Sequence, residues 1–187
     1  MKKTGILSIL ISVLIACSTT NEDDVVVESA SEKVNIIDTR EERMAEVDKY
    51  TALVFQDSIK LNIENANKLL SAYEQYIIHH SFQSDSKEIM FKAGELAKAL
   101  NRPHVAIKYF NQLLERDPDH EKAPIALFYK AMIIGDVLHE DDLAIKTYKE
   151  FIDTYPNHPF VESAKQSIAL QGKSLDDIVK EFEKKNS

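Results

Sequence analysis

The sequence predicts an all-α fold in which antiparallel helix pairs stack in tandem as an α-solenoid. From about residue 38 onward, apolar residues recur at steps of three and four, which is the period of an amphipathic helix. A similar helical pattern returns after 38 residues. The chain has 187 residues but only four glycines, and it has no Asn-Gly or Asp-Gly pair to signal a hairpin. We therefore expect helices and no strands.

The first 16 residues have the pattern of a secretory signal peptide. Lys2 and Lys3 give a positive start, and an apolar run from Ile6 to Ala16 follows, interrupted only by two serines. This run is too short to span a bilayer as a stable helix. We therefore exclude residues 1–16 from the predicted fold.

The signal ends in the stretch Leu14-Ile15-Ala16-Cys17, which resembles the lipobox of bacterial lipoproteins. The resemblance implies cleavage before Cys17, which becomes the acylated first residue, and this covalent lipid is the only cofactor-like group we expect. Two or three acyl chains anchor a protein stably, whereas one holds it weakly. Cys17 is also the only cysteine, which excludes an intramolecular disulfide and a cysteine-rich zinc site. The alternative is an ordinary buried cysteine in an N-terminal helix.

Residues 17–37 are predicted to be the lipidated cysteine and a flexible acidic tether, because they are rich in acids, Ser, Thr and Asn. Ser18, rather than Asp, follows the cysteine. By resemblance to lipoprotein sorting in bacteria with two membranes, this implies an outer-membrane lipoprotein, and we favour its periplasmic face. The run Glu22-Asp23-Asp24 resembles export signals of some surface-exposed lipoproteins, although a solvated linker also explains it.

The helical domain is predicted to span residues 38–187. Periodicity places its helices at residues 38–60, 63–80, 87–100, 103–116, 122–137, 141–154, 158–171 and 174–185. Asn101, Asp141 and Ser174 suit N-caps, and Gly172 suits a C-terminal stop.

Two helix pairs repeat the same residues at an offset of 38. Each contains, in order, a small residue, an alanine, an aromatic residue and a proline: Gly94, Ala106, Phe110 and Pro118, then Ala131, Ala144, Tyr148 and Pro156. A weaker copy lies upstream and includes Ala66 and Tyr76. Small residues let paired helices approach closely, the aromatic ring fills the gap between them, and proline ends the second helix.

This order resembles the tetratricopeptide repeat (TPR). The clearest repeats are placed at residues 87–120 and 124–157, a degenerate repeat at about 44–85, and C-terminal capping helices at 158–185. The usual period is 34 rather than 38, and most of the excess lies in the turn after the proline. In this respect the chain is similar to outer-membrane TPR lipoproteins of the BamD/ComL type, involved in β-barrel assembly, and to the periplasmic YbgF/CpoB type.

The sequence contains no pattern typical of an enzyme. The stretch His139-Glu140-Asp141-Asp142 resembles a metal site only superficially, because a turn followed by a helix start explains its acids. His120 and His158 recur because the turn recurs, which favours a capping role. There is no glycine-rich phosphate loop and no nucleophile motif. We expect no catalytic residue, no metal site and no small-molecule substrate.

In the TPR family the first helix of each pair lines a concave groove that binds peptides or partner helices. Transferred to this chain, the resemblance implies a partner groove formed by Glu88, Phe91, Glu95, Lys98, Ile125, Phe128 and Met132. The alternative is that flanking helices fill this groove and that these residues belong to the core.

The predicted function is a non-enzymatic, lipid-anchored protein–protein interaction scaffold of the bacterial cell envelope. It would bind a component of an outer-membrane assembly, secretion or cell-wall machine, and it would contact the membrane through its lipid. Residues 49–187 contain 21 acidic and 18 basic side chains without a basic stripe, so we expect no nucleic-acid partner. The alternative is a surface-exposed or self-associating structural lipoprotein, suggested by the apolar seam Met44, Val47, Val54 and Leu61.

Overall fold

The computed structural model describes residues 39–54, 56, 61–174, 179–180 and 183–184. All of them belong to the compact unit of residues 36–187, which is distinct from residues 1–35. The predicted signal peptide, the lipidated Cys17 and the acidic tether lie outside the described residues. Most of the helix predicted at 174–185 lies outside them as well.

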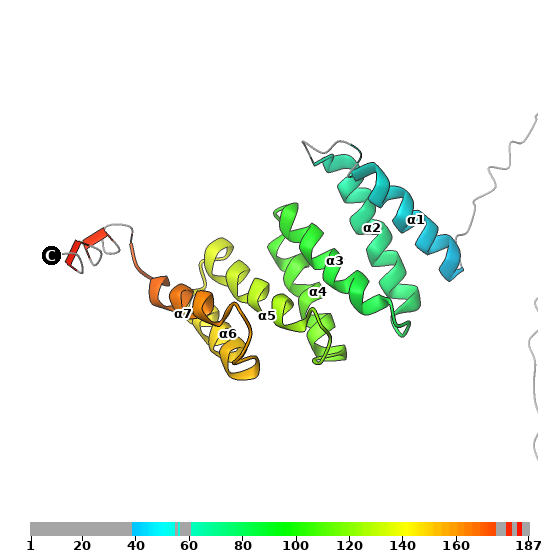
Figure 1. The fold of residues 1–187 in the computed structure, drawn as a ribbon. Coiled ribbons are helices and arrows are strands. Elements are labelled where there is room, and N and C mark those ends of the chain that lie inside the picture. The colour runs from blue at the N-terminus through cyan, green and yellow to red at the C-terminus, as the bar shows by residue number, and fades with distance from the viewer. Residues whose placement is uncertain (1–38, 55, 57–60, 175–178, 181–182, 185–187) are drawn as a thin grey trace, which may run out of the picture. The chain divides into compact units, whose positions relative to one another are not determined.

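The described residues form helices and contain no strand, so the predicted all-α fold class is confirmed (Figure 1). The elements are α1 (Arg40–Val54), α2 (Ile63–His80), α3 (Ser86–Ala99), α4 (Pro103–Arg116), α5 (Ala123–Met132), the π-helix η1 (Ile133–Val137), α6 (Asp141–Thr154) and α7 (Val161–Leu170). None of these helices is long and apolar enough to cross a membrane. The first helix, predicted at 38–60, is described from Arg40 to Val54, and residues 57–60 of the predicted range lie outside the described residues.

Each α-helix packs mainly on its neighbours along the chain, and most extensively within the pairs α1–α2, α3–α4 and α5–α6. Figure 1 shows this succession as helix pairs that follow one another. Such packing is typical of an α-solenoid, in which each pair leaves an apolar face for the next pair to cover. The predicted TPR-like solenoid of helix pairs is therefore confirmed.

The residues that repeat in the sequence occupy equivalent buried places. Ala66, Ala106 and Ala144 are fully buried in the second helix of successive pairs. In the first complete repeat, Gly94 on α3 faces the ring of Phe110 on α4, and a methyl group added to Gly94 would lie 2.7 Å from Cδ1 of that ring. The small residue therefore lets the two helices approach closely, as the sequence predicts.

The turn between α3 and α4 corrects the predicted N-cap. Asn101 has a positive φ of 53°, and its backbone N–H donates to the carbonyl of Lys98 at 3.0 Å. The next N–H, of Arg102, donates to the carbonyl of Ala97 at 2.8 Å. This pair of hydrogen bonds is a Schellman motif, in which a left-handed residue ends the preceding helix. Asn101 thus closes α3, and the N-cap position of α4 is Arg102.

The helix predicted at 122–137 changes its winding after Met132. Residues Ile133–Val137 form a π-helix, in which the N–H of Leu138 donates to the carbonyl of Ile133 at 3.1 Å. His139 then adopts a positive φ of 56°, at the position that corresponds to Asn101 one repeat earlier. Asp141 is the first residue of α6 and not its N-cap, which is Glu140. Gly172, with φ of 74°, follows the end of α7 as predicted.

Two apolar clusters stabilise the helices. The N-terminal core cluster joins α1–α4 and reaches Ala126 and Ile133, whereas the C-terminal core cluster joins α5, α6 and α7 around Phe151. Leu114 packs against both. The seam on α1 belongs to the first cluster, because Val47 and Val54 are buried in it. Val47 and Val54 therefore pack within the chain, whereas Met44 and Leu61, the other two residues of the seam, are only partly buried.

Candidate protein-binding cleft

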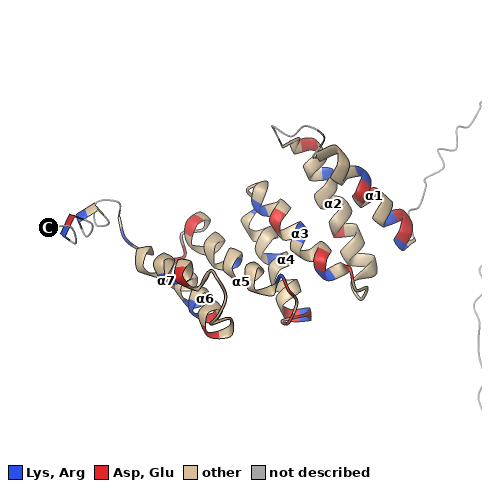
Figure 2. Ribbon diagram, in the orientation of Figure 1, with Lys and Arg blue, Asp and Glu red and all other residues tan. Residues whose placement is uncertain are grey.

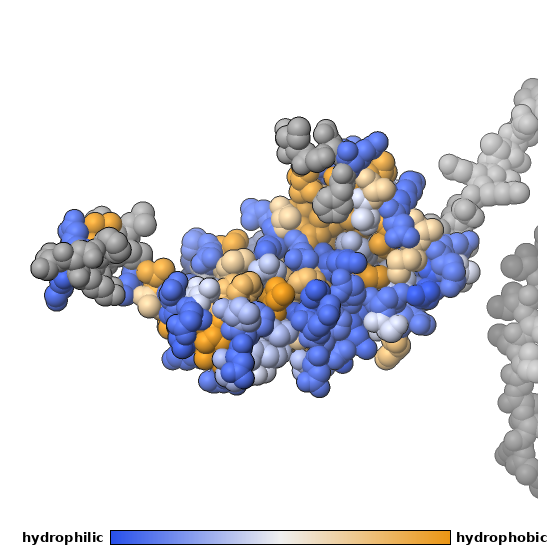
Figure 3. All heavy atoms as spheres, in the orientation of Figure 1, coloured by the Kyte–Doolittle hydropathy of each residue, from blue (hydrophilic) through white to orange (hydrophobic). Residues whose placement is uncertain are grey.

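A cleft of about 520 Å³ lies between α1 and α3, over α2. We call it the α1–α3 cleft. Its apolar lining comes from all three helices and the start of the segment before α2: Met44, Val47, Leu61, Leu69, Tyr73, Ile89, Leu96 and Ala99. In Figure 3, hydrophobic atoms reach the surface on the part of the molecule that holds α1 and α2, and hydrophilic atoms surround them. The cleft has the volume and the mainly apolar lining that ligand-binding sites have.

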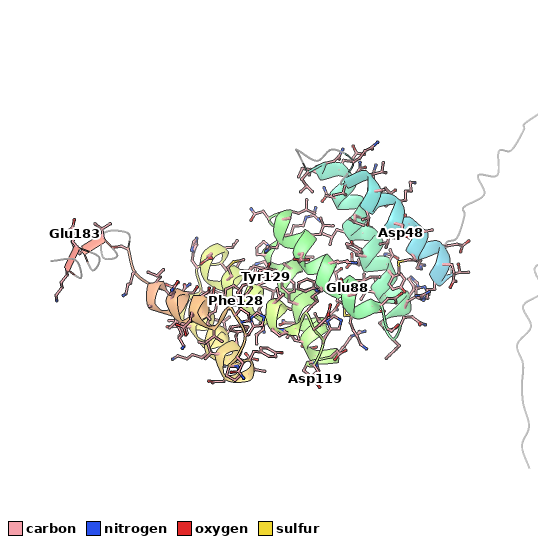
Figure 4. All side chains as sticks on the ribbon, viewed as in Figure 1. Asp48, Glu88, Asp119, Phe128, Tyr129 and Glu183 are labelled. Atoms are coloured by element: carbon pink, nitrogen blue, oxygen red, sulfur yellow. The ribbon has the colours of Figure 1, made fainter. Side chains whose placement is uncertain are left out.

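The polar side chains of the cleft are mostly acidic. Among the residues that the structure describes, Asp48, Asp85, Glu88 and Glu95 line it, and Lys92 is the one basic residue that does. Figure 2 shows acidic residues along both α1 and α3. Figure 4 shows Asp48 on the first of these helices and Glu88 on the other. The cleft therefore combines an apolar floor with a negative rim.

Asp85 is held in place at one end of the cleft by two other helices. The Tyr76 hydroxyl donates to Oδ1 of Asp85 at 2.6 Å, and the Arg40 guanidinium donates to its Oδ2. Burial acts to raise the pKa of Asp85, but the hydrogen bonds from Tyr76 and Arg40 outweigh it and lower that pKa. The carboxylate is thus kept ionised and joins α1, α2 and the start of α3. It supports the wall of the cleft and is already paired.

Asp48 and Glu95 differ from Asp85 because neither forms an ion pair or a side-chain hydrogen bond within the described part of the chain. Glu88 forms an i, i+4 ion pair with Lys92, in which Oε1 of Glu88 lies 3.6 Å from Nζ of Lys92. Glu95 is half-buried, and burial is the main cause that raises the pKa of this carboxyl. A positive group that entered the cleft would therefore find two acceptors that no base of the described chain occupies.

The predicted groove residues on α3 divide between this cleft and the core. Glu88 and Glu95 line the cleft. Phe91 is 5% exposed, and its ring packs against that of Phe110, with the two ring centroids 6.0 Å apart. Lys98 lies over the ring of Tyr129, with its Nζ 3.6 Å from the ring centroid. Phe91 and Lys98 thus contact neighbouring helices.

The predicted groove residues on α5 also make contacts within the fold. Phe128 packs against the rings of Tyr148, Phe151 and Phe160, with centroid separations of 5.6, 5.5 and 5.0 Å. Figure 4 shows Phe128 and Tyr129 on α5. Ile125 packs against the N-terminal core cluster and Met132 against the C-terminal one. Phe91 is thus buried, as in the alternative that these side chains belong to the core, whereas Phe128 is only partly buried against the C-terminal core cluster.

The wall formed by α1 was not among the predicted groove residues. Met44, Val47, Asp48 and Thr51 line the cleft from this helix. The sequence contains the signal, because Met44 and Val47 belong to the apolar seam, but the partial seven-residue spacing of that seam suggests self-association and not a cleft wall. Its partly buried members instead border an open cleft within the chain.

The two recurrent histidines cap turns. Nδ1 of His120 accepts a hydrogen bond from the N–H of Lys122 at 3.2 Å, and Nδ1 of His158 accepts one from the N–H of Phe160 at the same distance. The capping role expected from their repetition is confirmed. Among the residues that the structure describes, no group of three His, Cys, Asp or Glu side chains is placed to hold a metal ion.

Comparison with known proteins identifies the repeats. Residues 88–120 and residues 126–158 match the model of the tetratricopeptide repeat family. The first range contains most of α3 and all of α4, and the second contains most of α5 and all of η1 and α6. No curated protein matches the chain. TPR domains are in general protein-interaction modules without catalysis, and this chain carries two tetratricopeptide repeats in its helical unit.

Proposed function

We propose that this chain is a lipid-anchored protein–protein interaction scaffold of the bacterial cell envelope. The observation that carries the interaction role is the pair of TPR repeats at residues 88–120 and 126–158. The α1–α3 cleft beside the first repeat supplies a surface that a partner can enter. The partner would be a component of an outer-membrane assembly, secretion or cell-wall machine, in keeping with the long inter-repeat turn that resembles the BamD/ComL and YbgF/CpoB types.

The lipid anchor is proposed from the sequence around Cys17. A positive start, a short apolar run and Leu14-Ile15-Ala16-Cys17 follow one another in the order of a lipoprotein signal. Acylation of the mature N-terminus with two or more chains would hold the scaffold at a membrane. With Ser18 after the cysteine, we place it at the outer membrane, facing the periplasm.

Metabolic labelling with a palmitate analogue tests the anchor. The full-length chain should incorporate the label, and Cys17→Ala should abolish incorporation and leave the uncleaved precursor. Ser18→Ala is the matched control, because it changes a neighbour but keeps the acylated thiol. Equal labelling of the Cys17→Ala chain would contradict the proposal.

Protease shaving of intact cells tests the location. If the scaffold faces the periplasm, its helical unit should survive until the outer membrane is permeabilised. Digestion in intact cells would instead support display on the cell surface. This is the alternative suggested by Glu22-Asp23-Asp24, which resembles the export signals of some surface-exposed lipoproteins. A periplasmic protein that is degraded only after permeabilisation serves as the control for membrane integrity.

Photo-crosslinking in cells tests the interaction surface. A crosslinking residue at Asp48 or Ala99 lies in the cleft, whereas one at the exposed Asp153 on α6 does not. A partner that uses the cleft should be captured from the first two positions and not from the third. Substitution of Phe91 would be uninformative, because this residue is buried and its loss would disturb the fold.

A further inference from the structure

We infer that the α1–α3 cleft selects a basic, amphipathic segment of its protein partner, in which apolar side chains are flanked by lysine or arginine. This inference rests on the proposed scaffold function and specifies the chemistry of its ligand. Its basis is the combination of an apolar floor with acidic side chains on both walls.

The floor of the cleft would receive apolar side chains. Leu69 and Tyr73 of α2 form it, and Met44 and Leu61 border it while only partly buried. A partner that covers the accessible apolar surface of a concave site removes this surface from water, which stabilises the complex. An amphipathic segment can do this because it presents a stripe of apolar residues.

The rim would receive basic side chains. Asp48 approaches from α1, and Glu88 and Glu95, seven residues apart and therefore on one face of α3, approach from the other side. Asp48 and Glu95 form no ion pair within the described residues. Lys98, Lys122 and Lys92 act on Glu95 at longer range, and they lower its pKa less than burial raises it. Lysine or arginine side chains that flank the apolar stripe would complement this rim.

The same charges disfavour a second copy of this chain as the occupant. The chain carries a formal net charge of −8, so two copies repel one another at long range.

The length of the walls favours a segment of a protein over a small molecule. The lining residues run from Met44 to Thr51 on α1 and from Glu88 to Ala99 on α3, which corresponds to about 10 Å and about 16 Å of helix. A helix that inserts residues at i, i+3, i+4 and i+7 is one known mode of binding to such a groove.

A designed peptide tests this chemistry without knowledge of the natural partner. The probe has about 14 residues, the length of α3, with leucine at the helical i, i+3, i+4 and i+7 positions and lysine elsewhere. Its counterpart carries glutamate in place of every lysine. Binding to the full-length chain in detergent is measured by fluorescence anisotropy over a range of salt concentrations. The lysine peptide should bind, and more weakly as salt increases, whereas the glutamate peptide should not.

Variants of the chain locate the binding site. The double change Asp48→Asn with Glu95→Gln should weaken binding about tenfold, because it removes both unpaired acids. The control, Glu115→Gln with Asp153→Asn, changes the net charge equally at exposed positions outside the cleft and should leave the affinity unchanged. Ala99→Phe fills the cleft from an exposed position and should weaken binding while the acids remain. Far-ultraviolet circular dichroism verifies that every variant keeps its helices.

Two results would overturn the inference. One is equal affinity of the wild-type chain and both cleft variants for the lysine peptide, because the peptide would then bind outside the cleft. The other is equal binding of the lysine and glutamate peptides. Either result would leave the scaffold function itself standing, since palmitate labelling and crosslinking in cells test that function independently.

Discussion

At the scale of single residues, the closest approach between paired helices depends on Gly94. A methyl group at this position would lie 2.7 Å from Cδ1 and 2.9 Å from Cζ of the buried Phe110 ring. The ring cannot move aside easily, so we expect Gly94→Ala to lower the free energy of unfolding by about 1–3 kcal/mol through overpacking. Urea denaturation measures the effect. The control is Gly135→Ala, which meets only the end of the flexible Gln171 side chain. An equal cost at both positions would contradict the proposed close approach.

A second prediction at this scale concerns Tyr76 at alkaline pH. The pKa of Tyr76 is raised from 10.0 to about 12, mainly by burial and secondly by the hydrogen bond to Asp85. Between these values the unfolded chain loses the phenol proton while the folded chain keeps it. The free energy of unfolding should therefore fall as pH rises from about 10 to about 12. Tyr73, Tyr109, Tyr148 and Tyr155 also have raised pKa values, so Tyr76→Phe should reduce this slope without abolishing it.

Thermal unfolding at a series of pH values, followed by circular dichroism, measures both parts of this prediction. At neutral pH the Tyr76→Phe variant should lose about 1 kcal/mol, the typical net value of one hydrogen bond. Asp85→Ala should cost more, because it leaves the buried Tyr76 hydroxyl without its acceptor and removes the shorter of the two ion pairs of Arg40. An unchanged alkaline slope in Tyr76→Phe would show that the other tyrosines account for it.

At the scale of elements, the turns that precede α5 and α7 share a histidine cap. In each turn, Nδ1 of the histidine accepts the N–H of the residue two positions later. His120→Ala removes this acceptor, and we expect a loss of about 0.5–1.5 kcal/mol, in the range of a typical intramolecular hydrogen bond. His120→Asn places an oxygen at a similar distance from the backbone and should retain most of the stability. Urea denaturation compares the two variants, and an equal loss would show that the ring acts by packing.

Element type was predictable from the sequence, but the ends of the helices were less so. Repeating apolar residues indicated α2, α3, α4 and α6 close to their observed bounds, because burial of one face imposes the helical period. Asn101 was misassigned because asparagine suits both an N-cap and the left-handed position after a helix. The π-helix after Met132 has no comparable local signal, since it depends on how the chain joins α5 to α6.

At the scale of the whole molecule, the candidate site shows what a repeat pattern does not specify. The pattern identified α3 and α5 as first helices of their pairs. It did not show which of their faces neighbouring helices cover, because this depends on the packing of α1, α4 and α7. Glu88 and Glu95 therefore line an open cleft. Phe91, chosen from the same family pattern, is buried against Phe110, and the partly buried Phe128 packs against Phe151.

The division into two core clusters predicts that the cleft can persist when the C-terminal helices are weakened. In a solenoid, stability is close to a sum over neighbouring repeats, so damage stays partly local. Phe151 is fully buried in the C-terminal core cluster, and its replacement by alanine should cost about 3–5 kcal/mol. Hydrogen exchange of Phe151→Ala should then show lost protection in α6 and α7, with retained protection in α2 and α3.

The matched variant is Phe110→Ala, which removes an equally buried ring from the N-terminal core cluster. This variant should lower the protection of backbone amides in α3 and α4 from hydrogen exchange. It should also weaken the binding of the lysine peptide, because α3 forms one wall of the cleft. Phe151→Ala should leave that binding intact. If both variants lose protection uniformly from α1 to α7, the helical unit unfolds as one cooperative body, and the cleft depends on the last repeat through the shared contact at Leu114.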